Sequence, residues 1–168
     1  SRCRLSSLCG HLVDSHAPTH LSKAGRRHPD LVGRLMVVDM IPFMGAMFGP
    51  PGRLYVYASY GIHRNVNIVC APEGVGQGCL LRGGEVLSGI DTAFARRGTS
   101  DFHNLARGPG NLGKALGATL EDNHLPVQLS ERESAPEWVR GPRIGISKNQ
   151  EAALRFWIPF DKTVSGRR

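Results

Sequence analysis

All three tyrosines of the chain lie within six residues, next to amide and basic side chains. Aromatic rings can stack on nucleobases, and amide and basic groups can bind base edges or phosphates. An enzyme that acts on a base inside a duplex has to turn that base out, fill the gap and hold the base between aromatic faces. If the base is positively charged, each ring adds a cation–π attraction of about 0.5 to 2 kcal/mol. The residues of this segment with suitable chemistry are Arg53, Tyr55, Tyr57, Tyr60, His63, Arg64, Asn65 and Asn67.

The tyrosines also have a simpler explanation, because aromatic side chains commonly pack on the face of a sheet. Alternation along a strand puts Tyr55 and Tyr57 on one side, whereas Tyr60 falls where the chain is expected to turn. The pattern leaves both base stacking and sheet packing open for Tyr55 and Tyr57.

A second candidate is the run Gly-Pro-Gly-Asn-Leu-Gly at 108–113, which has the G-x-G-x-x-G spacing of dinucleotide-binding loops. The context argues against that function, because no convincing strand precedes the run and no alternating strand–helix units surround it. Arg107, Lys114 and the free amides at the start of the next helix could instead hold a DNA phosphate. A glycine-rich helix entry with solvated charges is the alternative.

Asp39 is the candidate for acid–base chemistry. It lies near the end of an apolar segment, where burial would raise its affinity for protons unless a cation such as Arg82 holds it ionised. A buried carboxylate beside a cation could orient and deprotonate a water for attack on a sugar carbon. An edge position that faces solvent is the alternative explanation for this acid.

The elements that must position these groups are short strands and helices. We expect a loop over 15–30, a strand over 31–43 that closes at Pro42, and a turn over 48–52. A hairpin follows, with strands over 54–60 and 66–70. The remaining expected elements are strands over 78–82, 141–147 and 154–158 and helices over 85–97 and 111–117, the first with Val86, Ile90 and Phe94 on one face. Together they predict an α+β fold with a mainly antiparallel sheet.

The composition favours one domain that binds a polyanion. With 168 residues, 40% of them hydrophobic, the chain can bury one core, so we expect a single domain over 1–168. The formal net charge of +7 favours nucleic acid, because Lys and Arg release counterions from phosphates, although many basic proteins bind none.

Other classes of protein are not favoured. No run approaches the roughly 18 apolar residues of a membrane span, so we expect a cytoplasmic protein without a membrane partner. The cysteines have no Cys-x-x-Cys spacing, and no paired histidines accompany them, so we expect thiols and no metal. These cysteines are Cys3, Cys9, Cys70 and Cys79.

The run Met-Phe-Gly-Pro-Pro-Gly-Arg-Leu-Tyr-Val-Tyr at 47–57, continued at 60–63 and 67–70, closely resembles the hallmark of bacterial alkyladenine (3-methyladenine) DNA glycosylases. Further segments resemble the same family in the same order, at 8–10, 80–82, 106–112, and from 134 on to 141–147. The resemblance is clear over 47–158, whereas 1–46 is divergent.

The resemblance implies a monofunctional enzyme that flips an alkylated purine and hydrolyses its glycosidic bond. By position, Tyr60 would be the wedge in the duplex, Tyr57 would stack on the base and Asn67 would discriminate among purines. Arg82 would hold the water-activating carboxylate. His63 would join the base pocket, and further contacts with DNA would come from Arg53, Tyr55, Arg64, Arg107 and Lys114.

The family also implies a single mixed domain around a curved antiparallel sheet with flanking short helices. It needs no cofactor and no metal. Its partner is double-stranded DNA that contains a damaged base, and we expect a monomer associated with the bacterial nucleoid.

One region departs from the family pattern. Members end an early strand with Glu-x-Glu-Ala-Tyr, in which the second glutamate activates water, whereas this chain has Asp39-Met-Ile-Pro-Phe43. Ile41 then occupies the glutamate position and Phe43 that of a stacking tyrosine. A shift of two residues brings Asp39 to the catalytic position instead, but loses the aromatic match.

The family's next loop, which carries a pocket histidine, is also missing from its usual place. A catalytically impaired DNA-binding relative is therefore the alternative to an active enzyme. An RNA-binding module with a similar sheet is a third hypothesis, which rests on fold analogy alone.

Overall fold

The structure is a computed structural model that describes residues 20–23, 33–42, 45–129, 136–147 and 149–166. For residues 20–23, 33–42, 45 and 128 it describes the backbone only. Phe43 and the family-like segment at 8–10 lie outside the described residues.

Eight strands of the described chain form one open sheet in which every pairing is antiparallel. The strands are β1 (His20–Lys23), β2 (Gly33–Pro42), β3 (Leu54–Ser59), β4 (His63–Val69), β5 (Gln77–Val86), β6 (Val127–Gln128), β7 (Val139–Gly141) and β8 (Arg155–Trp157). Their order is β3-β4-β5-β2-β1-β6, and β8 pairs with both β2 and β7. The α+β fold predicted from the sequence is therefore confirmed.

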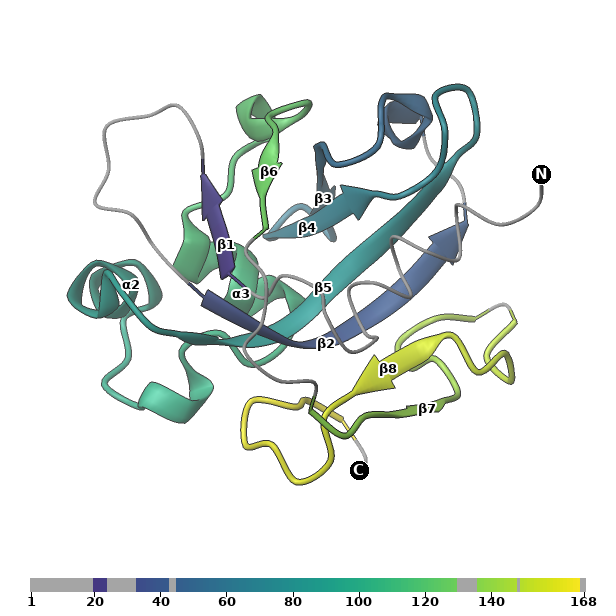
Figure 1. Ribbon diagram of the computed structural model, residues 1–168. Coiled ribbons are helices and arrows are strands. Elements are labelled where there is room, and N and C mark those ends of the chain that lie inside the picture. The colour runs from purple at the N-terminus through teal and green to yellow at the C-terminus, as the bar shows by residue number, and fades with distance from the viewer. Residues whose placement is uncertain (1–19, 24–32, 43–44, 130–135, 148, 167–168) are drawn as a thin grey trace.

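The long strands β2 and β5 form the centre of the sheet and curve across the molecule side by side (Figure 1). Their register shifts on either side of Val37, which is the signature of an irregularity that bends and twists a strand. Just beyond this point β2 also pairs with β8, so that residues 37–39 have strand neighbours on both sides.

Two helices, α2 (Ile90–Arg97) and α3 (Pro109–Leu116), cover one face of the sheet, and α3 packs on β4 and β5 (Figure 1). Short 3-10 helices occur at η1 (Gly45–Phe48), η2 (Phe102–Asn104) and η3 (Leu120–Asp122). In the part of the chain that the structure describes, no helix has the length and apolar character needed to cross a membrane.

The core lies between α2, α3 and the sheet. It forms because apolar side chains alternate along the hairpin strands and recur along the helices. Its buried members are Leu54, Val56, Val66, Ile68, Cys70, Cys79, Leu81, Val86, Ala93, Leu105, Ala106, Leu112, Ala115 and Leu116.

Most sequence predictions of strands and helices are confirmed, with shifted ends. The early strand ends at Pro42 as predicted, and β3 agrees with its expected range. The helix predicted from Glu85 begins only at Ile90, because Glu85 and Val86 continue β5 and pair with β2. The second helix begins earlier than predicted, with Pro109 in its first turn, where the missing N–H costs nothing.

Two predictions were wrong. The segment 141–147 is not a strand, because only Val139–Gly141 pairs with β8, after which the chain turns through Pro142 and Gly145. The segment 15–30 is not all loop, because His20–Lys23 forms β1 between β2 and β6. Neither short strand has enough residues to produce an alternating apolar pattern.

Phe160 offers a test of local backbone strain. Its φ is 61° and its side chain is 90% exposed, so a left-handed conformation is imposed on a residue with a β-carbon. We predict that Phe160→Gly stabilises the protein by about 1 kcal/mol, seen as a melting temperature higher by roughly 2 to 4 °C. Phe160→Ala keeps the β-carbon and should give no such gain. An equal rise in both variants would show that the exposed ring, and not the backbone, is responsible.

Candidate functional site

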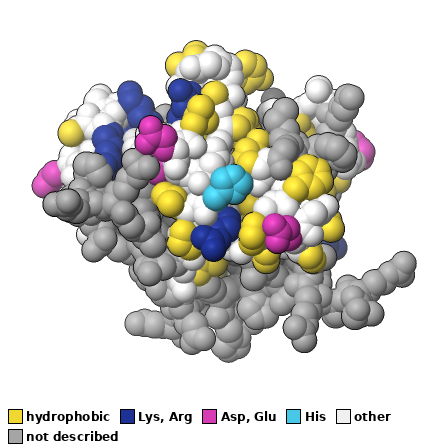
Figure 2. Space-filling model, turned by 90° about the horizontal axis from the view of Figure 1, so that it is seen from above, with side chains coloured by type: hydrophobic (Ala, Val, Ile, Leu, Met, Phe, Trp, Pro, Cys, Tyr) yellow, Lys and Arg dark blue, Asp and Glu magenta, His cyan; other side chains and the backbone are white. Residues whose placement is uncertain are grey.

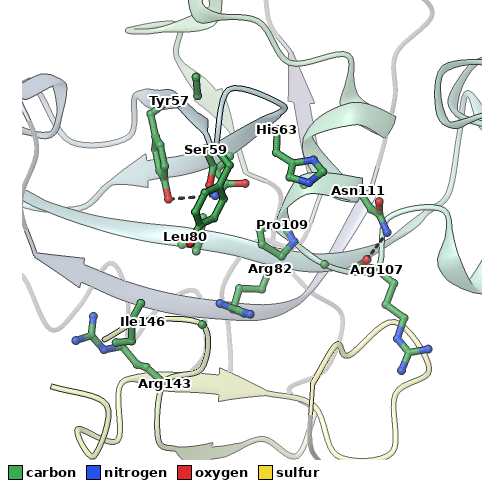
Figure 3. Close-up of a pocket in the computed structure, with 16 residues that line it drawn as sticks. Tyr57, Ser59, His63, Leu80, Arg82, Arg107, Pro109, Asn111, Arg143 and Ile146 are labelled. Carbon is green, nitrogen blue, oxygen red and sulfur yellow. Dashed lines mark hydrogen bonds between the residues drawn. The ribbon is translucent and has the colours of Figure 1, made fainter. Parts of the chain in front are cut away.

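A cleft of about 690 Å³ lies between the β3–β4 hairpin, the start of α3 and the loop that follows β7 (Figure 3). Tyr57 and Arg82 reach it from two strands, while Arg143 and Ile146 approach from the opposite side (Figure 3). Its described lining comprises residues 57–60, His63, Asn65, Leu80, Arg82, residues 107–111, Arg143, Gly145 and Ile146. Segments far apart in the sequence thus build one site.

Tyr57 forms an aromatic wall of the cleft. Its ring stacks on that of Tyr55, with centroids 5.6 Å apart and an angle of 28° between the planes. Tyr55 is only 6% exposed and packs with Met47 and Val69, so it supports Tyr57 from behind. The pKa of the Tyr55 phenol is raised, mainly by burial and to a smaller extent by the neighbouring Tyr57. The phenol therefore stays neutral at physiological pH.

The hairpin ends in a tight turn that exposes two apolar side chains. Tyr60 and Gly61 both have positive φ, 49° and 70°, and the N–H of Ile62 donates to the carbonyl of Ser59 at 3.1 Å. Positive φ at both central residues is typical of a type I′ turn. The register pairs Ser59 with His63, so the connection consists of the three residues 60–62. Tyr60 is 91% exposed and Ile62 78% exposed. The sequence prediction of a connection over 61–65 was wrong, because a tyrosine is unusual at a position that favours Asn or Gly.

The glycine-rich run at 108–113 lets the hairpin lie directly on α3. A β-carbon on Gly113 would lie 1.7 Å from the backbone oxygen of Arg64, and one on Gly110 would lie 2.6 Å from His63 Nδ1. Gly108 precedes the helix with φ 94°. The spacing that resembles a dinucleotide loop therefore reflects close packing of a helix against a hairpin.

Three arginines line the cleft, and each holds a backbone carbonyl in a later segment. Arg82 Nη1 donates to Ile144 at 3.3 Å, Arg107 Nε to Val164 at 3.2 Å, and Arg143 Nη2 to Asn149 at 3.1 Å. No acidic side chain is among the described lining residues. Among the described lining residues the charged side chains are therefore basic, which suits a phosphate-bearing ligand.

The basic side chains elsewhere do not form one continuous patch on the face seen in Figure 2. Lys and Arg side chains there stand as separate groups among hydrophobic ones. The distribution of basic side chains on this face therefore does not identify a surface that binds nucleic acid.

The backbone of β2 runs next to the cleft. Asp39 pairs with Leu80, which lines the cleft, and on its other side with Arg155. Ile41 pairs with Gly78, which is not among the described lining residues. Phe43, expected to stack on the base, lies outside the described residues.

Among the residues singled out from the sequence, the structure brings together six at the cleft, which are Tyr57, Tyr60, His63, Asn65, Arg82 and Arg107. Others lie apart from it. Arg53 donates to the carbonyl of His124 at 3.2 Å, Arg64 is half-buried, and Lys114 is exposed on α3.

Asn67 and Tyr55 are buried rather than presented to the cleft. Asn67 is fully buried, and its Nδ2 donates to the backbone oxygen of Tyr55 at 3.0 Å. For Tyr55, burial favours the packing explanation that the sequence left open, because only 6% of the residue is exposed.

Sequence reasoning assigned no site residue to part of the cleft, although the segments 106–112 and 141–147 that contribute to it resemble the family. Arg143, Gly145 and Ile146 come from a segment expected to be a strand, and Asn111 was not singled out. The hydrogen bond from Arg82 to the carbonyl of Ile144 connects the loop after β7 to the strand that lines the cleft.

An aromatic wall, an exposed aromatic side chain and a cationic cleft on one α+β scaffold define a class of protein that binds nucleic acid through its bases. A model of the methylpurine-DNA glycosylase family matches residues 39–162. The chain therefore belongs to this family and is a DNA repair glycosylase. The match includes Asp39, in the region that the sequence suggested to be divergent.

Several bacterial proteins named "Putative 3-methyladenine DNA glycosylase" are similar to the chain. The one from Corynebacterium efficiens is 62% identical over 128 residues, which cover 73% of this chain and 67% of that protein. One from Corynebacterium glutamicum is 62% identical over 133 residues, covering 76% and 70%. One from Mycobacterium leprae is 46% identical over 130 residues, covering 73% and 60%. The resemblance to this family is confirmed.

The contact between the hairpin and α3 can be tested by filling it. We predict that Gly113→Ala destabilises the protein by about 3 kcal/mol, because the new methyl meets a backbone oxygen that cannot rotate away. Lys114→Ala, exposed on the same helix, is the control and should change the free energy of unfolding by less than about 0.5 kcal/mol. Urea denaturation followed by circular dichroism measures both, and equal stabilities would contradict the close packing.

Proposed function

We propose that this protein turns an alkylated purine out of duplex DNA and hydrolyses its N-glycosidic bond, which leaves an abasic site. The observation that carries the proposal is the position of Tyr60, which is 91% exposed on the hairpin whose Tyr57 lines the cleft. One strand and its turn thus offer both a side chain to enter the duplex and a surface to receive the base. The partner would be double-stranded DNA with a damaged base, bound by a monomer in the bacterial cytoplasm.

Tyr60 has the properties of a wedge. An exposed ring at a positive φ stabilises neither the core nor the backbone, so the fold alone does not account for it. A planar side chain on a narrow turn can enter the minor groove and occupy the space of the displaced base. Ile62, also on the turn, would widen the apolar contact.

Tyr57 would receive the displaced base. Its ring is already supported on one side by Tyr55, so that its other side remains for a ligand in the cleft. An alkylated purine with a positive charge gains cation–π attraction there.

The DNA backbone would be held by cations around the cleft. Arg107 lies on the cleft, beside the first turn of α3, whose first backbone N–H groups have no partner within the helix. His63, which also lines the cleft, would join the base pocket. Arg64, Arg53 and Lys114 lie outside the described lining of the cleft and would contact phosphates further along the duplex.

Asp39 is the residue that we propose to activate water, with Arg82 nearby to keep it ionised. Two observations support the assignment: Asp39 is the only acidic residue of β2, and it pairs with Leu80 in the cleft wall. In the reaction, water attacks C1′ of the sugar, the bond from C1′ to the base nitrogen breaks, and Asp39 takes the proton released by water. A cationic base leaves as a neutral molecule, so its departure needs no acid.

Asp39→Asn tests this step. We predict a loss of at least about 100-fold in the rate of base release, because the amide cannot accept a proton. Release of free methylated purines from methylated duplex DNA, followed by chromatography, measures it. Asp91→Asn, on the exposed surface of α2, is the matched control. Undiminished release by the Asp39 variant removes this residue from the mechanism, whereas DNA binding without release by the unaltered protein supports the impaired relative.

A second test concerns the wedge. We predict that Tyr60→Ala weakens binding to duplex DNA with an abasic site at least tenfold, and binding to single-stranded RNA much less, because only a duplex has a gap to fill. Phe160→Ala is a close control, since Phe160 is also about 90% exposed at a positive φ but does not line the cleft. Equal losses on both nucleic acids would reject the wedge and favour the RNA-binding hypothesis.

A further inference from the structure

Two tyrosines and two asparagines form a ladder across the β3–β4 hairpin. The register places Tyr57 opposite Asn65 and Tyr55 opposite Asn67. Side chains that are directly opposite in an antiparallel pair lie on one face and contact each other. The ladder runs from the buried end of the hairpin, at Tyr55 and Asn67, to the cleft, at Tyr57 and Asn65.

The two asparagines of the ladder hold different groups. Asn67 is fully buried and donates to a backbone oxygen, so it fixes the hairpin itself. Asn65 Nδ2 donates instead to the phenol oxygen of Tyr57 at 3.1 Å, which Figure 3 shows as a dashed line from the tip of that ring. Asn65 is 7% exposed and lines the cleft. Its amide therefore fixes the far end of the side chain that forms the aromatic wall.

We propose that Asn65 is a positioning residue, which holds the Tyr57 ring at the angle needed to stack on the displaced base. The inference rests on the function proposed above and adds the residue that shapes its base-binding surface. Tyr55 supports one face of the Tyr57 ring and Asn65 holds its hydroxyl end, so the ring is fixed at two places before a base arrives. A ring ordered in advance loses less freedom on stacking, which favours the flipped state of the base.

The first arm of the test examines the free protein. With only three tyrosines, a protein labelled with ¹³C at tyrosine Cζ gives three NMR signals, and Tyr57→Phe assigns one of them. We expect Asn65→Ala to move the Tyr57 signal and to leave that of the exposed Tyr60 in place. Asn65→Asp removes the amide donor and offers only an acceptor for the phenol proton, so it should not restore the original Tyr57 signal. An unchanged Tyr57 signal in Asn65→Ala overturns the proposal.

The second arm examines the base. A duplex that contains the fluorescent base 1,N⁶-ethenoadenine reports stacking of the flipped base, and single-turnover release reports hydrolysis. We expect Asn65→Ala to reduce the flipped fraction and the release rate roughly two- to tenfold, the usual net effect of one hydrogen bond. The dissociation constant for DNA should change less than twofold, because the phosphate contacts remain. Loss of folding would instead impair binding and release together.

The double variant Asn65→Ala/Tyr57→Phe separates positioning from other roles. If Asn65 acts through the phenol, the double variant is no worse than the poorer single variant. Losses that multiply, or full activity in Asn65→Ala, overturn the proposal while leaving the proposed function intact. If the unaltered protein neither changes this fluorescence nor releases methylated purines from methylated duplex DNA, the proposed function fails, and the inference fails with it.

Discussion

The contact between the β3–β4 hairpin and the first turns of α3 is the constraint on which the cleft depends. Gly110 and Gly113 have no side chains, so the backbone of Arg64 and the ring of His63 lie directly on the helix. Any β-carbon at Gly113 would push the hairpin away, and with it the wall that carries Tyr57. The geometry of the site therefore depends on this close contact between a strand pair and a helix.

The two ends of the hairpin lie in different environments. Its buried end is fixed by core residues and by the Tyr55–Asn67 pair, whereas its tip exposes Tyr60 and Ile62. Rigid support behind an exposed side chain lets that side chain act on a ligand without rearrangement of the fold. Three arginines that line the cleft donate to backbone carbonyls of later segments, so the same side chains also hold the chain around the cleft.

Because the chain belongs to the methylpurine-DNA glycosylase family, this geometry can be interpreted in terms of DNA base repair. The chain has Asp39 in β2, in a region where the family pattern has two glutamates, so the acid proposed to activate water is a point of departure from that pattern. The register of β2 favours Asp39 over Ile41 as the residue next to the cleft. Asp39 pairs with Leu80, which lines the cleft, whereas Ile41 pairs with Gly78, which is not among the described lining residues.

The sequence by itself determined the α+β class, the strands around Pro42 and the hairpin, and the family, because alternation, proline and a long specific motif are local properties. It did not determine which tyrosine and which asparagine face the cleft. Tyr55 and Tyr57 share one face of β3, and only the helix and neighbouring strands bury one and leave the other accessible. Nor could it place Arg143 and Ile146, since a loop without its own periodicity is positioned by contacts with distant residues such as Arg82. Burial and long-range contact belong to the folded chain, and these decided the site.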